Sequence, residues 1–107
     1  MIHLVTFTLN PPDVARQMKM FEELQTSAAW MHEINDTWLI DSAENKFQIW
    51  NRLSKHVLPG DRMLIIEITH QNVPWGLLTA QGWAWVNLHL AINSPSPYQN
   101  LPPNPST

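Results

Sequence analysis

The chain is rich in side chains that stack on flat ligands or on protein surfaces, because six of its 107 residues are tryptophan. Three of these indoles lie close together in the last third of the chain. Such a cluster can pack on a neighbouring subunit, which we favour, or stack on a base or another flat ligand. Basic residues on the expected helices could bind phosphate, although solvated helix faces commonly carry them. The candidate binding residues are Trp75, Trp83, Trp85, Arg16, Arg52 and Lys55.

The histidines and acidic residues do not form a recognisable catalytic or metal-binding pattern. None of the five histidines forms a helical i, i+4 pair or a close strand pair, so we expect them at surfaces or interfaces. Asp36, Asp41 and Asp61 each fall at an expected turn or helix start, where aspartate usually makes local hydrogen bonds. Glycine-rich phosphate loops, Ser-His-Asp signatures and paired-carboxylate motifs are absent. We therefore expect no catalytic residue, no metal and no cofactor.

The composition excludes several classes of protein. Without cysteine there is no disulfide scaffold, zinc ribbon or redox pair, which is compatible with a reducing compartment such as the cytoplasm. A formal charge of −3 has the wrong sign for wrapping a nucleic acid, although local patches are possible. No apolar stretch approaches the roughly 18 to 20 residues of a membrane span. The N-terminal residues have no basic leader, so we expect a soluble, cytoplasmic protein without a membrane partner.

The first half of the chain predicts a strand, a helix and a hairpin. Residues 2–9 are strand-like and stop at Pro11-Pro12. Asp13 is placed to cap a helix that ends near Thr26-Ser27. Two short strands, 28–34 and 37–41, flank the turn-forming pair Asn35-Asp36. The apolar stripe expected on the helix consists of Val14, Met18, Phe21 and Leu24.

The second half predicts another helix, a strand and a third helix. Ser42 can cap the second helix, which Pro59-Gly60 ends, and residues 62–69 form a strand whose apolar character suggests burial on both faces. Residues 75–92 favour a helix, with a strand as the alternative. The apolar stripe expected on the second helix consists of Phe47, Trp50, Leu53 and Val57, and Ile49 broadens it. The apolar stripe expected on the third helix consists of Leu77, Ala84, Leu88 and Ala91.

The order of these elements indicates the fold. Strand, helix, strand, strand, helix, strand is the order of the ferredoxin-like βαββαβ unit, an α+β fold with a four-stranded antiparallel sheet. Residues 1–92 would form this domain with an extra C-terminal helix. Residues 93–107 contain five of the nine prolines and would form a flexible tail.

Both faces of the predicted sheet are apolar. Side chains that alternate along a strand lie on opposite faces of the sheet. The first strand places Ile2 and Leu4 on one face and Val5, Phe7 and Leu9 on the other. The last strand places Leu64, Ile66 and Ile68 on one face and Met63 and Ile65 on the other. Two helices cover only one face of such a sheet. We expect the other face to be covered by a second copy of the chain, by residues 75–92, or by both, and we therefore predict a homodimer.

Two runs of residues resemble a known family. Residues 36–41, Asp-Thr-Trp-Leu-Ile-Asp, are followed about twenty residues later by residues 60–68, Gly-Asp-Arg-Met-Leu-Ile-Ile-Glu-Ile. This arrangement is similar to the SinR-like small proteins, relatives of the smaller of the two CRISPR spacer-integration proteins, over residues 1 to about 90. The resemblance implies a ferredoxin-like homodimer.

The resemblance also bears on catalysis. In the CRISPR-associated relatives an aspartate at the end of the first strand is associated with a divalent metal and phosphodiester cleavage, and here Thr8 stands at that position. A neutral hydroxyl does not supply the anionic oxygen that Mg²⁺ prefers. Our leading hypothesis is a non-catalytic homodimer that binds a partner protein, a nucleic acid or a nucleotide. The alternatives are a metal-dependent nuclease with relocated acidic ligands such as Asp13, and a small nucleotide-binding protein.

Overall fold

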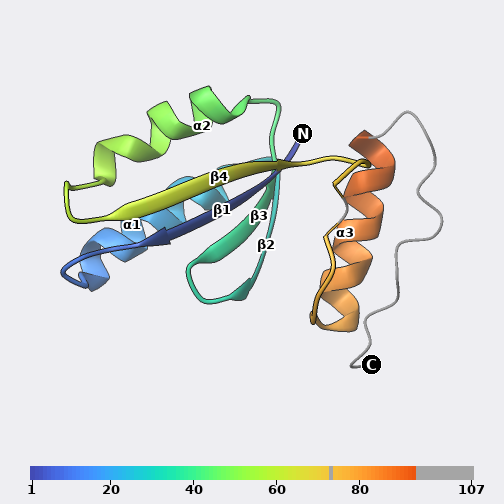
Figure 1. Cartoon of the computed structure of the whole chain (residues 1–107), viewed down its shortest axis with the longest axis horizontal. Coiled ribbons are helices and arrows are strands. Elements are labelled where there is room, and N and C mark those ends of the chain that lie inside the picture. Colours follow the sequence, from blue (N-terminus) through green and yellow to red (C-terminus); the bar gives the residue numbers. More distant parts are fainter. Residues whose placement is uncertain (73, 94–107) are drawn as a thin grey trace.

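The computed structural model of the chain describes residues 1–72 and 74–93, except for the side chains of residues 92 and 93. The order of the elements is the predicted one, and the α+β, ferredoxin-like fold class is confirmed (Figure 1). The strands are β1 (Ile2–Thr8), β2 (Ala29–Ile34), β3 (Thr37–Asp41) and β4 (Arg62–Ile68). The helices are α1 (Val14–Gln25), α2 (Lys46–Leu53) with a 3₁₀ turn at Ser54–His56, and α3 (Ala80–Asn93).

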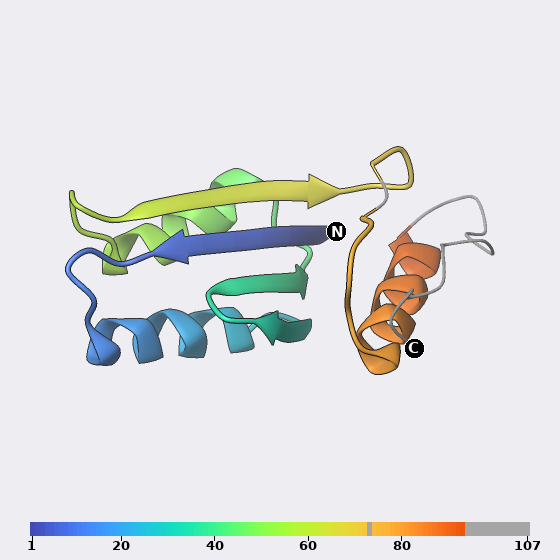
Figure 2. The same ribbon diagram turned by 60° about the horizontal axis from the view of Figure 1, so that its bottom comes forward.

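The four strands form one antiparallel sheet in the order β2-β3-β1-β4. Leu4 in the central strand β1 is paired with Leu39 in β3 and with Ile66 in β4, so these three side chains share one face. Helix α3 lies beside the end of the sheet at which β1 begins, as Figures 1 and 2 both show. None of the helices among residues 1–72 and 74–93 is long and apolar enough to cross a membrane.

Local capping determines where the first two helices begin. Asp13 caps α1 as predicted, because its side chain accepts a hydrogen bond from the backbone N–H of Arg16 at 3.2 Å. The predicted cap of α2 at Ser42 is wrong. Asn45 caps this helix instead, and Gln48 completes a capping box with it. Ser42 accepts a hydrogen bond from the backbone of Glu44 in the preceding turn, so the helix starts later than expected.

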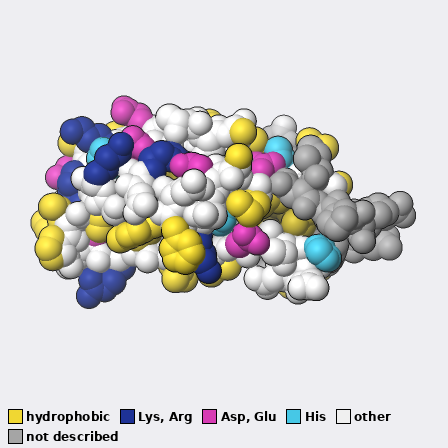
Figure 3. Space-filling model, turned by 90° about the horizontal axis from the view of Figure 1, so that it is seen from above, with side chains coloured by type: hydrophobic (Ala, Val, Ile, Leu, Met, Phe, Trp, Pro, Cys, Tyr) yellow, Lys and Arg dark blue, Asp and Glu magenta, His cyan; other side chains and the backbone are white. Residues whose placement is uncertain are grey.

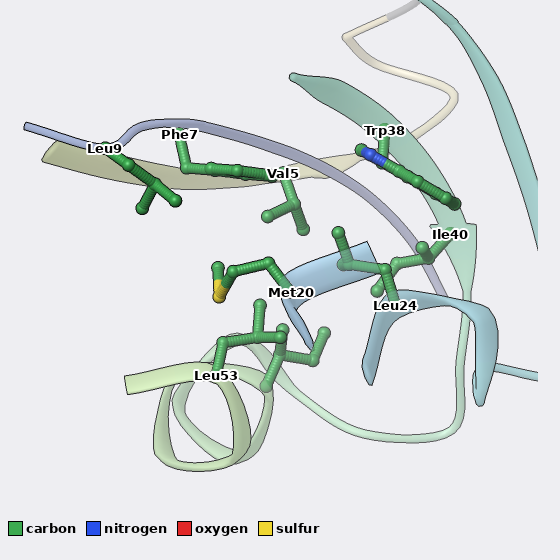
Figure 4. Close-up of a cluster of buried hydrophobic side chains, with 9 residues drawn as sticks. Val5, Phe7, Leu9, Met20, Leu24, Trp38, Ile40 and Leu53 are labelled. Carbon is green, nitrogen blue, oxygen red and sulfur yellow. The ribbon is translucent and has the colours of Figure 1, made fainter. Parts of the chain in front are cut away.

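A hydrophobic core fills the space between the sheet and helices α1 and α2 (Figure 4). Met20 and Leu24 are the residues of α1 buried in it, whereas the predicted stripe residues Val14 and Met18 are exposed. In α2 the buried residues are Ile49 and Leu53. The core consists of Val5, Phe7, Leu9, Met20, Leu24, Trp38, Ile40, Ile49 and Leu53.

The apolar stripe predicted for the second helix therefore faces solvent over most of its length and not the core. Phe47 and Trp50 are exposed, and α2 ends at Leu53, before Val57. Position 49, which the sequence pattern gave a secondary role, lies at the centre of the buried face. A helix this short carries so few apolar residues that two neighbouring faces fit its periodicity almost equally well.

Helix α3 covers one end of the opposite face of the sheet. Its Trp83, Val86 and Leu90 pack in a second cluster with Ile2, Leu39 and Ile68. The predicted stripe of the third helix is wrong, because Leu77 precedes α3 and is exposed, and Ala84, Leu88 and Ala91 are exposed too. The helix is predominantly apolar all round, so its periodicity does not show which face is buried.

The expectation that β4 is buried on both faces is wrong over its central part. Leu64 is 56% exposed and Ile66 is 38% exposed, whereas Ile68 is buried beneath α3. The reason is that α3 covers only the end of the sheet. Residue 93, the expected start of the proline-rich tail, ends α3, and the rest of that tail lies outside the described residues.

Candidate functional site

An apolar cavity lies between the sheet and the segment that leads into α3. Its volume is about 150 Å³, and strands β1, β2 and β3 supply one side of it. The described lining residues are Leu4, Met31, Glu33, Ile34, Thr37, Trp38, Leu39, Pro74, Trp75, Gly76, Leu77, Leu78 and Trp83. The cavity is therefore bounded by aliphatic and aromatic side chains and carries a single ionisable group, Glu33, among these residues. Such a concave apolar site is suited to a small ligand or to a side chain of a partner.

Two of the three candidate tryptophans line this cavity. Trp83 is 4% exposed and anchors α3 to the sheet, whereas Trp75 is 63% exposed. Their rings lie 6.2 Å apart and are inclined by 44°. The indole N–H of Trp83 is buried and has no hydrogen-bond partner among the described residues. Trp85 does not line the cavity and stacks instead on His89 at 4.0 Å.

Glu33 fixes the start of α3 beside the cavity. Its carboxylate accepts hydrogen bonds from the backbone N–H of Thr79 at 3.0 Å and from the Thr79 hydroxyl at 2.5 Å. A Cβ at position 82 would lie 2.6 Å from Oε2 of Glu33, so a larger residue there would displace this carboxylate. The sequence pattern did not identify Glu33, since the partners are 46 residues apart.

The three basic candidates are bound to carboxylates elsewhere in the molecule. Arg16 contacts Asp61 at 2.6 Å, and Arg52 contacts Glu44 at 2.9 Å. Lys55, 59% exposed, lies 3.5 Å from Glu23. In Figure 3 the Lys and Arg side chains, dark blue, lie on the half of the molecule away from α3, with acidic side chains among them. The structure therefore does not bring the basic and indole candidates together into one site.

Asp61 is the most strongly perturbed of the predicted acidic residues. Its buried carboxylate accepts hydrogen bonds from Arg16 and from the backbone N–H groups of Leu58 and Asn10, the latter two at 2.8 Å. The Arg16 guanidinium first, and these N–H groups with it, hold the pKa of Asp61 well below its usual range. This carboxylate stabilises the fold and is not available to a ligand.

The other acidic and imidazole groups serve local contacts. Asp41 lies 3.3 Å from the N-terminal ammonium and 2.7 Å from Nδ1 of His89. His32 stacks on Trp38 at 4.1 Å, and burial lowers the pKa of His3. Among residues 1–72 and 74–93, no group of three or more histidine, cysteine or acidic side chains is placed to hold a metal ion.

A second cavity, of about 200 Å³, lies at the end of β1, where the resemblance places its functional aspartate. Thr8, Asp13 and Asp36 all line it. Asp13 caps α1, and Asp36 accepts a hydrogen bond from the side-chain amide of Gln17 at 2.7 Å. This end of the strand thus carries two carboxylates even though Thr8 itself is neutral.

Comparisons with known proteins do not assign a family. A scan of protein-family models, a search of curated proteins and a search of solved structures each give no match to this chain. The resemblance to the SinR-like proteins therefore stays a prediction that rests on residues 36–41 and 60–68.

Proposed function

We propose that this chain is a non-catalytic binding protein, related to the CRISPR-associated ferredoxin-like proteins, that acts as a homodimer. The observation that carries the proposal is the uncovered part of the sheet. Leu64 and Ile66 project from it and are 56% and 38% exposed. On the neighbouring strand β1, Thr6 and Thr8 lie on the same face. Adjacent exposed aliphatic side chains of this kind are typical of a protein interface.

The chemistry of this surface favours a second copy of the chain as its occupant. In a twofold dimer each patch meets its own copy, so the patch must be complementary to itself. The paired positions Leu4–Ile66 and Thr6–Leu64 carry no charge, and Arg62 stands only at the end of β4. An apolar patch satisfies this requirement, whereas a patch of one charge would repel its copy. A nucleic-acid backbone would instead require cations.

We place a partner protein ahead of a nucleic acid or a nucleotide as the ligand of this dimer. Arg16 and Arg52 are bound to acidic side chains on the helical layer, and Lys55 lies beside Glu23 there. Trp75 and Trp83 line a cavity at the opposite face of the sheet. A bound nucleotide would need its base and its phosphate at the same place, and this arrangement separates the groups that would hold them.

Sedimentation velocity tests the dimer. We expect the wild-type protein to sediment as a dimer at micromolar concentration, and Leu64→Arg to sediment as a monomer with an unchanged circular dichroism spectrum. The matched control is Phe47→Arg, which places the same charge at an exposed apolar position of α2. It should remain a dimer. A monomeric wild type at all accessible concentrations, or a Leu64→Arg variant that dimerises as well as the control, contradicts the proposal.

One observation supports a second candidate function, a metal-dependent nuclease with relocated ligands. Asp13 and Asp36 line the same cavity as Thr8 at the end of β1, and carboxylates of this kind bind Mg²⁺ or Mn²⁺. This candidate predicts cleavage of labelled RNA or DNA with either metal, lost in Asp13→Ala and in Asp36→Asn. The second variant matters because Asp13 also caps α1. No cleavage with both metals would exclude this function.

A further inference from the structure

The cavity beside Trp75 and Trp83 has a definite chemical preference. Apart from Glu33, its described lining residues are uncharged, and none of them is lysine, arginine or histidine. An anionic ligand such as a phosphate ester would meet a carboxylate there and no compensating cation. An apolar ligand that is neutral or positively charged fits the lining better.

The volume of the cavity and the indoles that line it indicate which apolar ligand would fit. An apolar cavity of about 150 Å³ is known to accommodate a benzene ring, and this cavity has that volume. The inclined indoles of Trp75 and Trp83, 6.2 Å apart, supply ring surface for stacking or edge-to-face contact.

The carboxylate of Glu33 would attract a positively charged group of the ligand. Thr79 donates two hydrogen bonds to its carboxylate. An ionised carboxylate has about four lone-pair positions, so it can accept further donors. Among residues 1–72 and 74–93, no basic side chain forms an ion pair with Glu33. An ammonium group near this carboxylate and the exposed indole of Trp75 would gain both ionic and cation–π attraction.

We propose that this cavity binds a small arylalkylamine, that is, a molecule in which one aromatic ring carries a short alkyl chain ending in an ammonium group. The ring occupies the apolar cavity between the sheet and the two indoles. The ammonium lies at the rim beside Glu33. Leu4 lines this cavity and also belongs to the sheet face of the proposed dimer, whereas Leu64 and Ile66 do not line the cavity, so the ligand site does not require the homodimer.

Three probes that share one ring but differ in charge test the site. We expect 2-phenylethylamine to bind in isothermal titration calorimetry, 2-phenylethanol to bind about fivefold more weakly, and phenylacetate more weakly still, because one ionic contact is worth roughly 1 kcal/mol. Glu33→Gln should bring the affinity for the amine down to that for the alcohol. It keeps an oxygen that can accept one hydrogen bond from Thr79.

Two further variants distinguish binding at this cavity from non-specific binding to exposed aromatic side chains. Trp75→Ala should weaken the binding of the amine and the alcohol alike, whereas Trp50→Ala, an indole 44% exposed on α2, should change neither. No binding of any probe at millimolar concentration, phenylacetate bound as tightly as the amine, or Glu33→Gln with unchanged preference would each overturn the proposal. If Glu33→Gln disturbs the fold, the ranking of the three probes on the wild type decides alone. Sedimentation of the same samples reports the dimer separately.

Discussion

Arg16 and Asp61 form a two-point ion pair, with Nη1 2.6 Å from Oδ2 and Nη2 3.2 Å from Oδ1. The same carboxylate accepts the backbone N–H groups of Asn10 and Leu58. Gly60 lets the chain come this close, because a Cβ there would lie 2.6 Å from the carbonyl oxygen of Asn10. One buried carboxylate therefore joins α1, the β1–α1 turn and the loop before β4.

The first prediction concerns this carboxylate. Asp61→Asn should lower the Tm by about 10 °C, because it leaves the Arg16 guanidinium without its charge partner and turns an amide donor toward N–H groups. Thermal unfolding followed by circular dichroism measures the change. Asp13→Asn is the control, since it also removes a carboxylate near Arg16 but keeps an amide oxygen that can cap α1. Equal destabilisation by both variants would contradict the assigned role of Asp61.

The second prediction follows from the pKa of Asp61, which is lowered in the folded protein. A lowered folded-state pKa stabilises the protein fully above the unfolded-state value of about 3.9, and this stabilisation is lost as the pH falls below it. Urea unfolding between about pH 2.5 and pH 6 should show a steep loss of stability at the acid end. In Asp61→Asn this slope should be flatter, and parallel slopes for the two proteins would refute the prediction.

The third prediction concerns His3, whose side chain is fully buried on the helix-facing side of β1. Burial lowers the pKa of His3, and Glu67 at 3.9 Å opposes this effect only in part. The unfolded chain therefore binds a proton below about pH 6.5 that the folded chain does not, so His3 makes stability rise with pH in this range. His3→Leu should remove this contribution. An unchanged difference in the free energy of unfolding between about pH 5 and pH 7.5 would show that His3 does not titrate in this way.

The fourth prediction concerns the Glu33–Thr79 contact at the start of α3. Gly82→Ala should gain up to about 1 kcal/mol from helix propensity but lose the two hydrogen bonds, which contribute about 1 kcal/mol each. The net effect is a loss of stability.

A double-mutant cycle isolates this effect. In a Glu33→Ala background the Cβ at position 82 no longer meets the carboxylate, so Gly82→Ala should be neutral or stabilising there. Urea unfolding of the four proteins should give a coupling of about 2 kcal/mol. Additive effects would show that Gly82 is not required for the approach of Glu33.

The element order was predictable because local signals in the sequence agree with one another. Asp13 caps α1, and Asn35-Asp36 forms the turn between β2 and β3 as the dipeptide indicates. The alternation in β1 correctly separates Ile2 and Leu4 from Val5, Phe7 and Leu9, which lie in different clusters. These features depend on residues near each other in the sequence.

The buried faces of the helices and the candidate site depend on tertiary contacts, and here prediction failed. Met20 and Ile49 face the core because of where α1 and α2 cross the sheet, which periodicity alone does not determine. The Arg16–Asp61 and Glu33–Thr79 contacts span 45 and 46 residues. The sequence predicts Arg16 as a candidate for binding phosphate, and nothing in its own segment indicates that it pairs with an aspartate 45 residues away.

Strand β1 is common to both hydrophobic clusters, since Val5 and Phe7 belong to one and Ile2 to the other. Detachment of α3 would expose Ile2 and its neighbours to water. Detachment of α1 and α2 would expose Val5 and Phe7 on the other face of the same strand. The loss of either hydrophobic cluster would therefore weaken the packing of the other, because both include β1. We therefore expect the domain to unfold in a single cooperative step, in which a loss of packing on either face of β1 lowers the stability of the whole domain.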